Sequence, residues 1–182
     1  MFARTPRLLL RPGFPEDATM LAAAIADEAI VRNLATAPWP YRVRDAEAFL
    51  ASPRDPILPS FLVFERTDGA PQLVGSCGLG RRPSGAVEMG YWIARARWGR
   101  GFATEACTAL IAIARSLGLA SLEGAHFLDN PASARVLEKL GFEPRGLVAP
   151  RMSCARGTEV PSRLMQLRLS AEDAAEEEAL AA

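Results

Sequence analysis

The sequence predicts a single α/β domain: a mixed β-sheet with one parallel pair of strands near its middle and helices on both faces. Three observations support this fold class. Between residues 60 and 94, strand-like runs separated by turn residues are typical of an antiparallel meander. A strand, a long helical pattern and a further strand then span residues 86–127, an order that requires a parallel, right-handed crossover. A second helical pattern over residues 131–140 leads to the final strands.

The first sixty residues contain short elements separated by loops. Leucines at 8–10, between arginines, predict a short strand, and apolar residues recur at helical spacing over 15–25. A proline-rich loop over 37–43 precedes a short helix expected over 45–50. Residues 54–59 contain two more prolines and are therefore expected to form another loop.

The middle of the chain is expected to alternate strands and helices. The three strands of the meander are predicted over 60–65, 72–79 and 86–94, with Gly and Asp or Pro between them. The clearest helix is predicted over 103–117, because apolar residues recur there at helical spacing and Gly118 follows as a C-cap.

The last third of the chain completes the predicted sheet. A short strand is expected over 122–127, and the helix over 131–140 is closed by a glycine. Two final strands are expected over 142–148 and 164–169. The domain then covers residues 1–170, and the acidic residues 171–182 form a C-terminal tail.

Composition excludes several functional classes. The net charge is +0 and the pI is about 6.6, so bulk charge favours neither nucleic acid nor an acidic membrane as a partner. No apolar run approaches the roughly 18 residues that span a bilayer. The three cysteines, Cys77, Cys107 and Cys154, are too far apart for zinc-site spacing or a disulfide framework. We therefore expect a cytoplasmic protein without a metal.

Residues 97–106, RWGRGFATEA, predict an anion-binding turn between a strand and a helix. Gly99 and Gly101 let backbone N–H groups approach an anion closely, and the following helix N-terminus adds about half a positive charge. A dinucleotide fingerprint would need a third glycine where Thr104 stands, and no Gly-Lys-Ser/Thr follows as in a P-loop. A turn without a ligand remains the alternative.

A second motif, DNPASARVLEKLGF, begins at Asp129. Asn130 is expected to cap a helix whose first position is Pro131, and Ser133 lies in the first turn. The two motifs together resemble the acetyl-CoA site of the GNAT acetyltransferase superfamily. The sequence around them resembles that of the branch that contains ribosomal-protein N-terminal alanine and serine acetyltransferases. In the family's glycine motif, Trp98 stands at the usual Gln or Arg position, as is common in that branch.

The resemblance implies a GNAT-like domain in which the central parallel strands splay and acetyl-CoA, as co-substrate, lies in the gap. N–H groups of residues 99–104 would hold the diphosphate, with Arg97 or Arg100 adding charge and the Glu105 carboxylate pointing away. The backbone of Trp92 and Ile93, in the strand before this loop, would pair with pantetheine and donate to the thioester oxygen. The expected cofactor contacts are Trp92, Ile93, Arg97, Trp98, Gly99, Arg100, Gly101, Phe102, Ala103, Thr104, Asn130 and Ser133.

Glu88 is the best candidate for a general base, because a carboxylate can remove the amine proton through one or two waters. Alternation along its strand places it on the same face as Trp92. A solvated or arginine-paired glutamate is the alternative. The resemblance also places Ser133 near the sulfur, where its hydroxyl would hydrogen-bond the departing thiolate, although helix capping explains the residue in part. His126, the sole histidine, is a second candidate base that could equally be structural.

The resemblance implies transfer of an acetyl group to a primary amine by direct attack in a ternary complex. The acceptor is expected to be a protein N-terminal α-amine, bound between 39–43 and the late loops at 150–160. Trp39 and Tyr41 either line that pocket or pack within a loop. A small amine or aminoglycoside, a larger acyl group, and a CoA-binding sensor without turnover stay open as alternatives. The molecule is expected to be a monomer or a homodimer.

Overall fold

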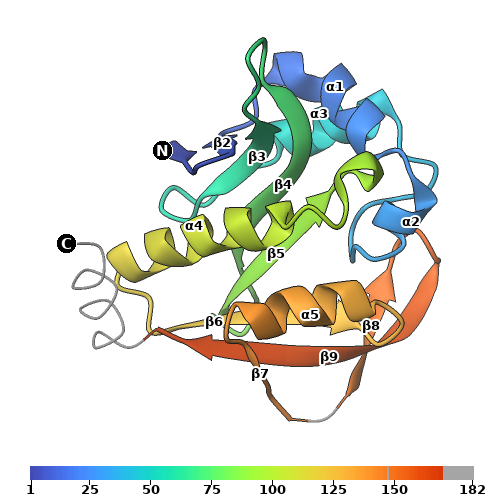
Figure 1. The fold of residues 1–182 in the computed structure, drawn as a ribbon. Helices are drawn as coiled ribbons and strands as arrows, with labels where there is room; N and C mark the ends of the chain where they lie inside the picture. The colour runs from blue at the N-terminus through green and yellow to red at the C-terminus, as the bar shows by residue number, and fades with distance from the viewer. Residues whose placement is uncertain (147, 170–182) are drawn as a thin grey trace.

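The computed structural model describes residues 1–146 and 148–169, and within them one sheet organises the molecule (Figure 1). Its strands are hydrogen-bonded in the order β1-β2-β3-β4-β5-β6-β9-β7, and β8 also pairs with β9. Every neighbouring pair is antiparallel except β5 and β6. The strands are β1 (Ala3–Arg4), β2 (Leu8–Arg11), β3 (Ser60–Glu65), β4 (Gln72–Arg81), β5 (Val87–Ile93), β6 (Ser121–Phe127), β7 (Glu143–Pro144), β8 (Ala149–Ser153) and β9 (Thr158–Arg168).

Helices cover both faces of the sheet. In Figure 1, α4 and α5 lie in front of it, while α1 and α3 lie together at the opposite side near β3 and β4. The described helices are α1 (Ala18–Ile25), α2 (Glu28–Val31), α3 (Val43–Ala51), α4 (Phe102–Ser116) and α5 (Pro131–Lys139), with 3₁₀ turns η1 (Pro15–Asp17) and η2 (Arg95–Arg97). The predicted fold class, with its central parallel pair and two helical layers, is confirmed.

The parallel pair opens soon after it begins. β5 follows β4 in continuous register from Val87 to Ile93, whereas it pairs with β6 at one position, Glu88 opposite Glu123. The two strands therefore separate over the second half of β5. This splay is the feature that the family resemblance implied.

Each face of the sheet has its own apolar core. On the α4 and α5 face, Phe102, Leu110 and Leu137 are buried against Leu122 and Met165 of the strands. On the other face, residues of α1 and α3 pack on β3 in a separate cluster. The period-two alternation predicted for β5 is confirmed, because its odd-numbered side chains belong to the first core and Trp92 packs against the second.

Most predicted elements are present, and the late ones differ. The strand predicted over 142–148 is present only as the short β7: it ends at Pro144, which has no N–H to donate, and Gly146 has a left-handed φ of 70°. Residues predicted as a late loop instead form β8 and the start of β9, joined by a turn at Gly157. The acidic tail predicted at 171–182 lies outside the described residues.

Candidate functional site

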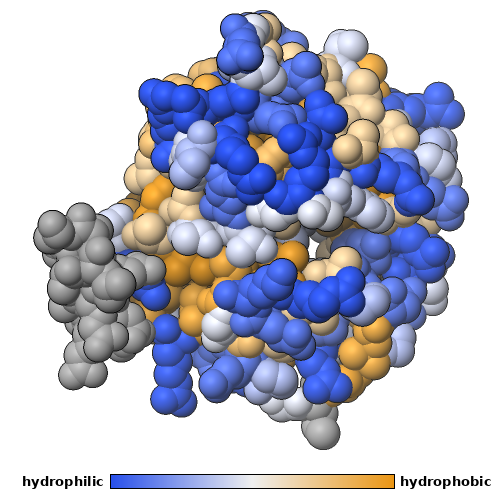
Figure 2. Space-filling view, viewed as in Figure 1, coloured by the Kyte–Doolittle hydropathy of each residue, from blue (hydrophilic) through white to orange (hydrophobic). Residues whose placement is uncertain are grey.

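A single cleft of about 1540 Å³ runs across the splayed strands and brings the two sequence motifs together. We call its two sides the cradle half and the α1–α2 half. The cradle half is formed by the loop before α4 and by the first turn of α5. The α1–α2 half is formed by α1, α2, the loop before α3 and the outer face of β5. Figure 2 shows apolar surface between α4 and α5, flanked by hydrophilic side chains.

The loop before α4 has the backbone shape of an anion cradle. Gly99 and Gly101 adopt left-handed φ angles of 73° and 78°, which other residues take only with strain. Gly101 is the N-cap of α4, and Phe102, Ala103 and Thr104 form its first turn. The N–H groups of a helix's first turn have no partner within the helix, so they are available to an anion.

The Glu105 carboxylate points away from this cradle, as predicted. It accepts hydrogen bonds from Thr5 Oγ1 at 2.6 Å and from the Arg7 backbone N–H at 2.9 Å. Burial raises the pKa of this carboxyl, but hydrogen bonds from Thr5 and Arg7 outweigh that effect and hold the pKa below its usual value. Arg7 Nη1 also donates to the Arg100 carbonyl at 2.9 Å, so the N-terminal segment fixes the loop from outside.

The two predicted arginines of the loop are both ion-paired with Glu65. Arg97 Nε lies 2.8 Å from one Glu65 oxygen, and Arg100 Nη2 lies 2.7 Å from the other. Arg97 lines the cleft. Arg100 does not, and it is the one exception among the predicted site residues, which all lie in the described part of the chain. The backbone of the loop thus faces the cleft more directly than the Arg100 side chain does.

Hydrogen bonding along β5 identifies which backbone groups face the gap. Ala94 N–H donates to the Val74 carbonyl and Arg82 N–H to the Ala86 carbonyl, both at 2.8 Å. Because bonding alternates along an antiparallel pair, Trp92 and the other even-numbered residues of β5 bond to β4. Tyr91 and Ile93 therefore direct their backbone toward the gap. This corrects the expectation for Trp92: its backbone faces β4, although the residue lines the cleft.

The Trp98 side chain hydrogen-bonds to the last residue of β5. Its indole Nε1 donates to the Ile93 carbonyl at 2.6 Å, and the Arg95 guanidinium lies 5.2 Å from its ring centroid. With that carbonyl occupied, the splayed end of β5 presents the N–H of Ile93 and both polar backbone groups of Tyr91 to the gap. A tryptophan at the usual Gln or Arg position thus has a structural role here.

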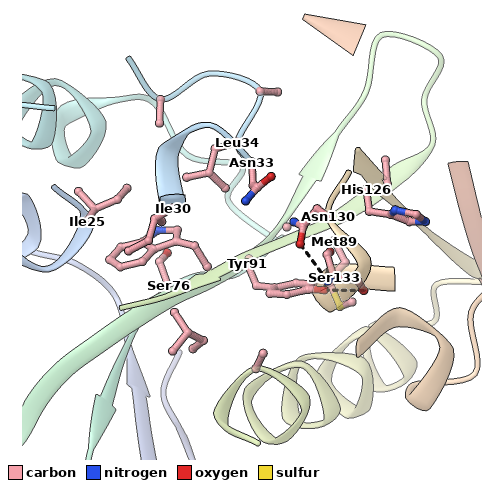
Figure 3. Close-up of a pocket in the computed structure, with 18 of the residues that line it drawn as sticks. Ile25, Ile30, Asn33, Leu34, Ser76, Met89, Tyr91, His126, Asn130 and Ser133 are labelled. Atoms are coloured by element: carbon pink, nitrogen blue, oxygen red, sulfur yellow. Dashed lines mark hydrogen bonds between the residues drawn. The ribbon is translucent and has the colours of Figure 1, made fainter. Parts of the chain in front are cut away.

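The first turn of α5 closes the other side of the cradle half. Asn130 caps the helix as predicted, because its Oδ1 accepts from Ser133 N–H at 3.2 Å (Figure 3). The Ser133 hydroxyl lies 2.8 Å from Tyr91 Oη, which is also 3.2 Å from the Ser133 carbonyl. Burial raises the pKa of Tyr91 despite the Ser133 hydrogen bond, so the phenol keeps its proton.

Sequence analysis did not single out Tyr91. The signal was present, since alternation along β5 places this side chain on the α5 face, beside the expected sulfur position. What the sequence lacked was the distance across the splay, which brings the phenol within hydrogen-bond range of Ser133.

Glu88 is paired with two arginines, the alternative that the sequence left open. Arg82 Nη1 donates to Glu88 Oε2 at 2.8 Å, and Arg151 Nη1 donates to Oε1 at 2.6 Å. Arg151 Nη2 also reaches Oε2 at 3.2 Å. Glu88 lines the cleft, but both of its carboxylate oxygens already accept hydrogen bonds, so direct proton transfer would require breaking one of them.

A second carboxylate in the cleft, that of Asp129, is also paired with two arginines. Asp129 accepts from Arg156 at 2.7 and 3.0 Å and from Arg32 at 3.4 Å. Arg156 Nε also donates to the Arg32 carbonyl at 2.8 Å. These bonds tie the turn between β8 and β9 to α2 and to the residue before Asn130.

The wall of the α1–α2 half is mostly apolar. Ile25, Ile30 and Leu34 line it, together with Tyr41 and the Trp92 ring, and Figure 3 shows the first three opposite Tyr91. Burial raises the pKa of Tyr41 to about 12. Tyr41 thus lies in the predicted pocket, whereas the neighbouring Trp39 is 41% exposed and, among the described residues, is not part of the cleft lining.

His126 lies at the end of β6 and lines the cleft (Figure 3). Its Nδ1 is 3.0 Å from the Phe127 carbonyl, which leaves Nε2 as the nitrogen available to another group. Its candidacy as a base stays a prediction. In residues 1–146 and 148–169, no group of three or more His, Cys, Asp or Glu side chains could hold a metal ion. No helix in the same described ranges is long and apolar enough to cross a membrane.

Comparison with known proteins identifies the family. Residues 7–143 match the family model described as the acetyltransferase (GNAT) domain. The chain belongs to the GNAT acetyltransferase family. The acetyltransferase is 30% identical over 152 residues to the uncharacterised N-acetyltransferase p20 of Bacillus licheniformis, a match that covers 79% of this chain and 83% of p20.

Two solved structures show how widely the fold is shared. One is a putative ribosomal-protein-serine acetyltransferase from Vibrio cholerae, with a TM-score of 0.72 and 24% identity over 92% of this chain and 97% of that one. The other is RimL, a ribosomal L7/L12 α-N-protein acetyltransferase in complex with coenzyme A. It has a TM-score of 0.75 and 15% identity over 93% of this chain and 98% of that one.

The residues present fit the co-substrate of a GNAT enzyme, acetyl-CoA. The left-handed glycines and the start of α4 suit a diphosphate, because a side chain at Gly101 would be strained where the backbone must approach an anion closely. The splay between β5 and β6 leaves Tyr91 and Ile93 backbone available to an extended arm. We therefore describe this protein as an acetyl-CoA-dependent acetyltransferase.

Proposed function

We propose that this acetyltransferase moves the acetyl group of acetyl-CoA to the α-amine of a protein N-terminus by direct attack in a ternary complex. The observation that carries the proposal is the continuity of the cleft, which joins the cradle half to an apolar wall across the splay. Two ligands can therefore meet over β5. The two ribosomal-protein acetyltransferases that share the fold support a protein acceptor.

The backbone of β5 is positioned to assist the attack. The amine nitrogen forms a bond to the thioester carbonyl carbon as the bond from that carbon to sulfur breaks, and the amine loses a proton. The N–H groups of Tyr91 and Ile93 face the gap, and we propose that they donate to the thioester oxygen as negative charge develops there. Such donors supply a large share of catalysis in acyl transfer.

We propose that the Ser133 hydroxyl stabilises the departing thiolate by donating a hydrogen bond to the sulfur. This hydroxyl can donate to sulfur when Tyr91 Oη donates to Ser133 Oγ, which the 2.8 Å separation permits. The phenol then orients the serine without giving up its own proton. A thiol has a pKa near 8.5, so a single neutral donor suffices.

The amine proton has three proposed routes: Glu88, His126 or water. An α-amine has a pKa near 8, so roughly a tenth of it is already neutral at pH 7. The two guanidinium groups on Glu88 favour water as the first acceptor, because the carboxylate oxygens are occupied. A Glu88→Gln variant whose kcat keeps its pH profile would remove Glu88 as the base.

The charges in the cleft disfavour an aminoglycoside acceptor. The carboxylates that line the cleft are Asp45, Glu88 and Asp129. Asp45 accepts from the Arg42 backbone N–H at 2.7 Å, and the other two are each bound by a pair of arginines. In the described part of the chain the cleft thus offers no unengaged carboxylate to a polycation. A neutral or anionic acceptor surface fits better.

The test measures thiol release from acetyl-CoA with matched peptides. One carries a free α-amine and no lysine, and its partner carries a blocked N-terminus and one lysine. We expect turnover only with the free α-amine. Turnover only with the lysine peptide, or with small amines alone, would overturn the proposed acceptor. Tight coenzyme A binding without thiol release from any acceptor would indicate a sensor instead.

A further inference from the structure

We propose that the acceptor site selects N-termini with an acidic side chain at the second or third residue, and that Arg82 and Arg151 bind this side chain. The inference rests on the proposed function, since it concerns how the same peptide is chosen. It gives a role to Arg82 and Arg151, to which the proposed function assigns none.

Three separate elements converge on this part of the cleft. Glu88 lies on β5, Arg82 at the turn between β4 and β5, and Arg151 on β8. The pairing distances of 2.8 and 2.6 Å place both guanidinium groups on the same carboxylate. Its side chain is 18% exposed, and those of Arg82 and Arg151 are 36% and 28% exposed. The cluster therefore lies at the wall of the cleft and only partly in solvent.

The cluster carries one positive charge in excess, because two guanidinium groups share one carboxylate. A charge partly removed from water is costly unless a partner compensates it. The Asp129 cluster, with Arg32 and Arg156, repeats this excess elsewhere on the wall of the cleft. Arg81, which also lines the cleft, is 3.6 Å from Asp55 and so adds little to the imbalance.

The arginines keep donors for a further anion. A guanidinium has five N–H groups in a planar fork that matches a carboxylate. Arg82 uses one of them on Glu88, and Arg151 uses two. An acidic side chain can thus bind beside Glu88 without displacing it.

The position of the cluster determines which peptide residue reaches it. Strands rise about 3.3 Å per residue, so Glu88 lies about 10 Å along β5 from Tyr91, whose N–H faces the proposed thioester position. An extended peptide covers that distance in about two residues plus a side chain. The first residue carries the reacting amine, which places the acidic side chain at position two or three.

The test compares kcat/KM for peptides that share their first residue and differ only at the next two positions, which are acidic, amide or basic. We expect the acidic peptide to exceed the amide peptide by about tenfold and the basic peptide to be poorest. The preference should shrink at high salt, because exposed charges are screened.

Variants assign the preference to the cluster. Arg82→Gln and Arg151→Gln should each remove most of the acidic preference while the amide peptide changes little. Arg168→Gln is the matched control, since Arg168 is exposed at the far end of β9 and the change in net charge is the same. Glu88→Gln should increase the acidic preference, because it leaves two uncompensated guanidinium groups.

The outcomes separate the inference from the proposed function. Equal kcat/KM across the three peptides, or a preference that Arg82→Gln and Arg151→Gln leave intact, would overturn the inference alone. Uniform loss of activity on every peptide in Glu88→Gln would make Glu88 a base instead of a charge partner. No turnover with any free α-amine would overturn both proposals.

Discussion

The two halves of the cleft are built in different ways. The cradle half uses backbone from two short stretches, the turn around Gly101 and the helix start at Asn130. The α1–α2 half is assembled from side chains of at least four segments, held by the clusters around Glu88 and Asp129. The first half depends on local conformation, and the second on distant pairings.

This difference suggests how each half can vary. A diphosphate needs N–H groups in one geometry, which few sequences other than glycine-bearing turns provide. An acceptor needs complementary charge and shape, which substitutions on β8 or α2 can change without disturbing the cradle. The mutations below test that separation, and the largest effect is expected in the cradle half.

Gly101→Asp should weaken acetyl-CoA binding by about 100-fold or more, because it strains the left-handed turn whose N–H groups face the expected diphosphate and adds a negative charge beside that turn. The matched control is Gly118→Asp. Gly118 has a similar left-handed φ of 70° at the other end of α4, with no atom near its Cβ position. Both variants should lose about 1 kcal/mol of stability. Calorimetric titration measures the affinity, and equal affinities in the two variants would contradict the cradle assignment.

Tyr91→Phe should lower kcat about tenfold and leave the affinity for acetyl-CoA nearly unchanged, because only the hydrogen bond to Ser133 is lost. Ser133→Ala should have a similar effect. If the phenol acts through the serine, the double variant should be little worse than Ser133→Ala alone. Steady-state kinetics gives all the values, and additive losses would show that the two hydroxyl groups act independently.

Glu105→Gln should leave activity at neutral pH almost unchanged. It should also make the free energy of unfolding fall less steeply as the pH is lowered. The pKa of Glu105 is depressed in the folded state by Thr5 and Arg7. Its contribution is therefore present above the ordinary glutamate pKa of about 4.5 and is lost as pH falls through the lower folded value. Urea unfolding between about pH 6 and 3 measures this. Glu138→Gln, at an exposed position, is the control. The same pH dependence of unfolding in both variants would refute a stabilising role for the bonds of Glu105 with Thr5 and Arg7.

The sequence predicted the cradle half well because its determinants are local. Gly99 and Gly101 require particular φ angles, and Asn130 with Pro131 starts a helix wherever it occurs. The backbone of Trp92 was expected to face the gap and instead faces β4, since the direction of each backbone group of β5 depends on its pairing with β4. The cofactor roles of these residues remain predictions that the binding experiments test.

The α1–α2 half was harder to predict because its contacts join residues far apart in the chain. Arg151 lies in a stretch of low strand propensity that becomes β8 only by pairing with β9. Its ion pair with Glu88 spans 63 positions, and no local pattern indicates it. Alternation did place Glu88 on the correct face, and Tyr41, which the sequence left open between a pocket and a packed loop, lines the cleft. Neither observation could reveal the charge balance.

The bonds from Thr5 and Arg7 to Glu105 and Arg100 have a practical meaning for anyone handling this enzyme. Removing a few residues from the start of the polypeptide, or fusing a bulky tag directly to them, would loosen a turn encoded nearly a hundred codons later. During synthesis on the ribosome, these bonds can form only after α4 has emerged, although Thr5 and Arg7 emerge much earlier.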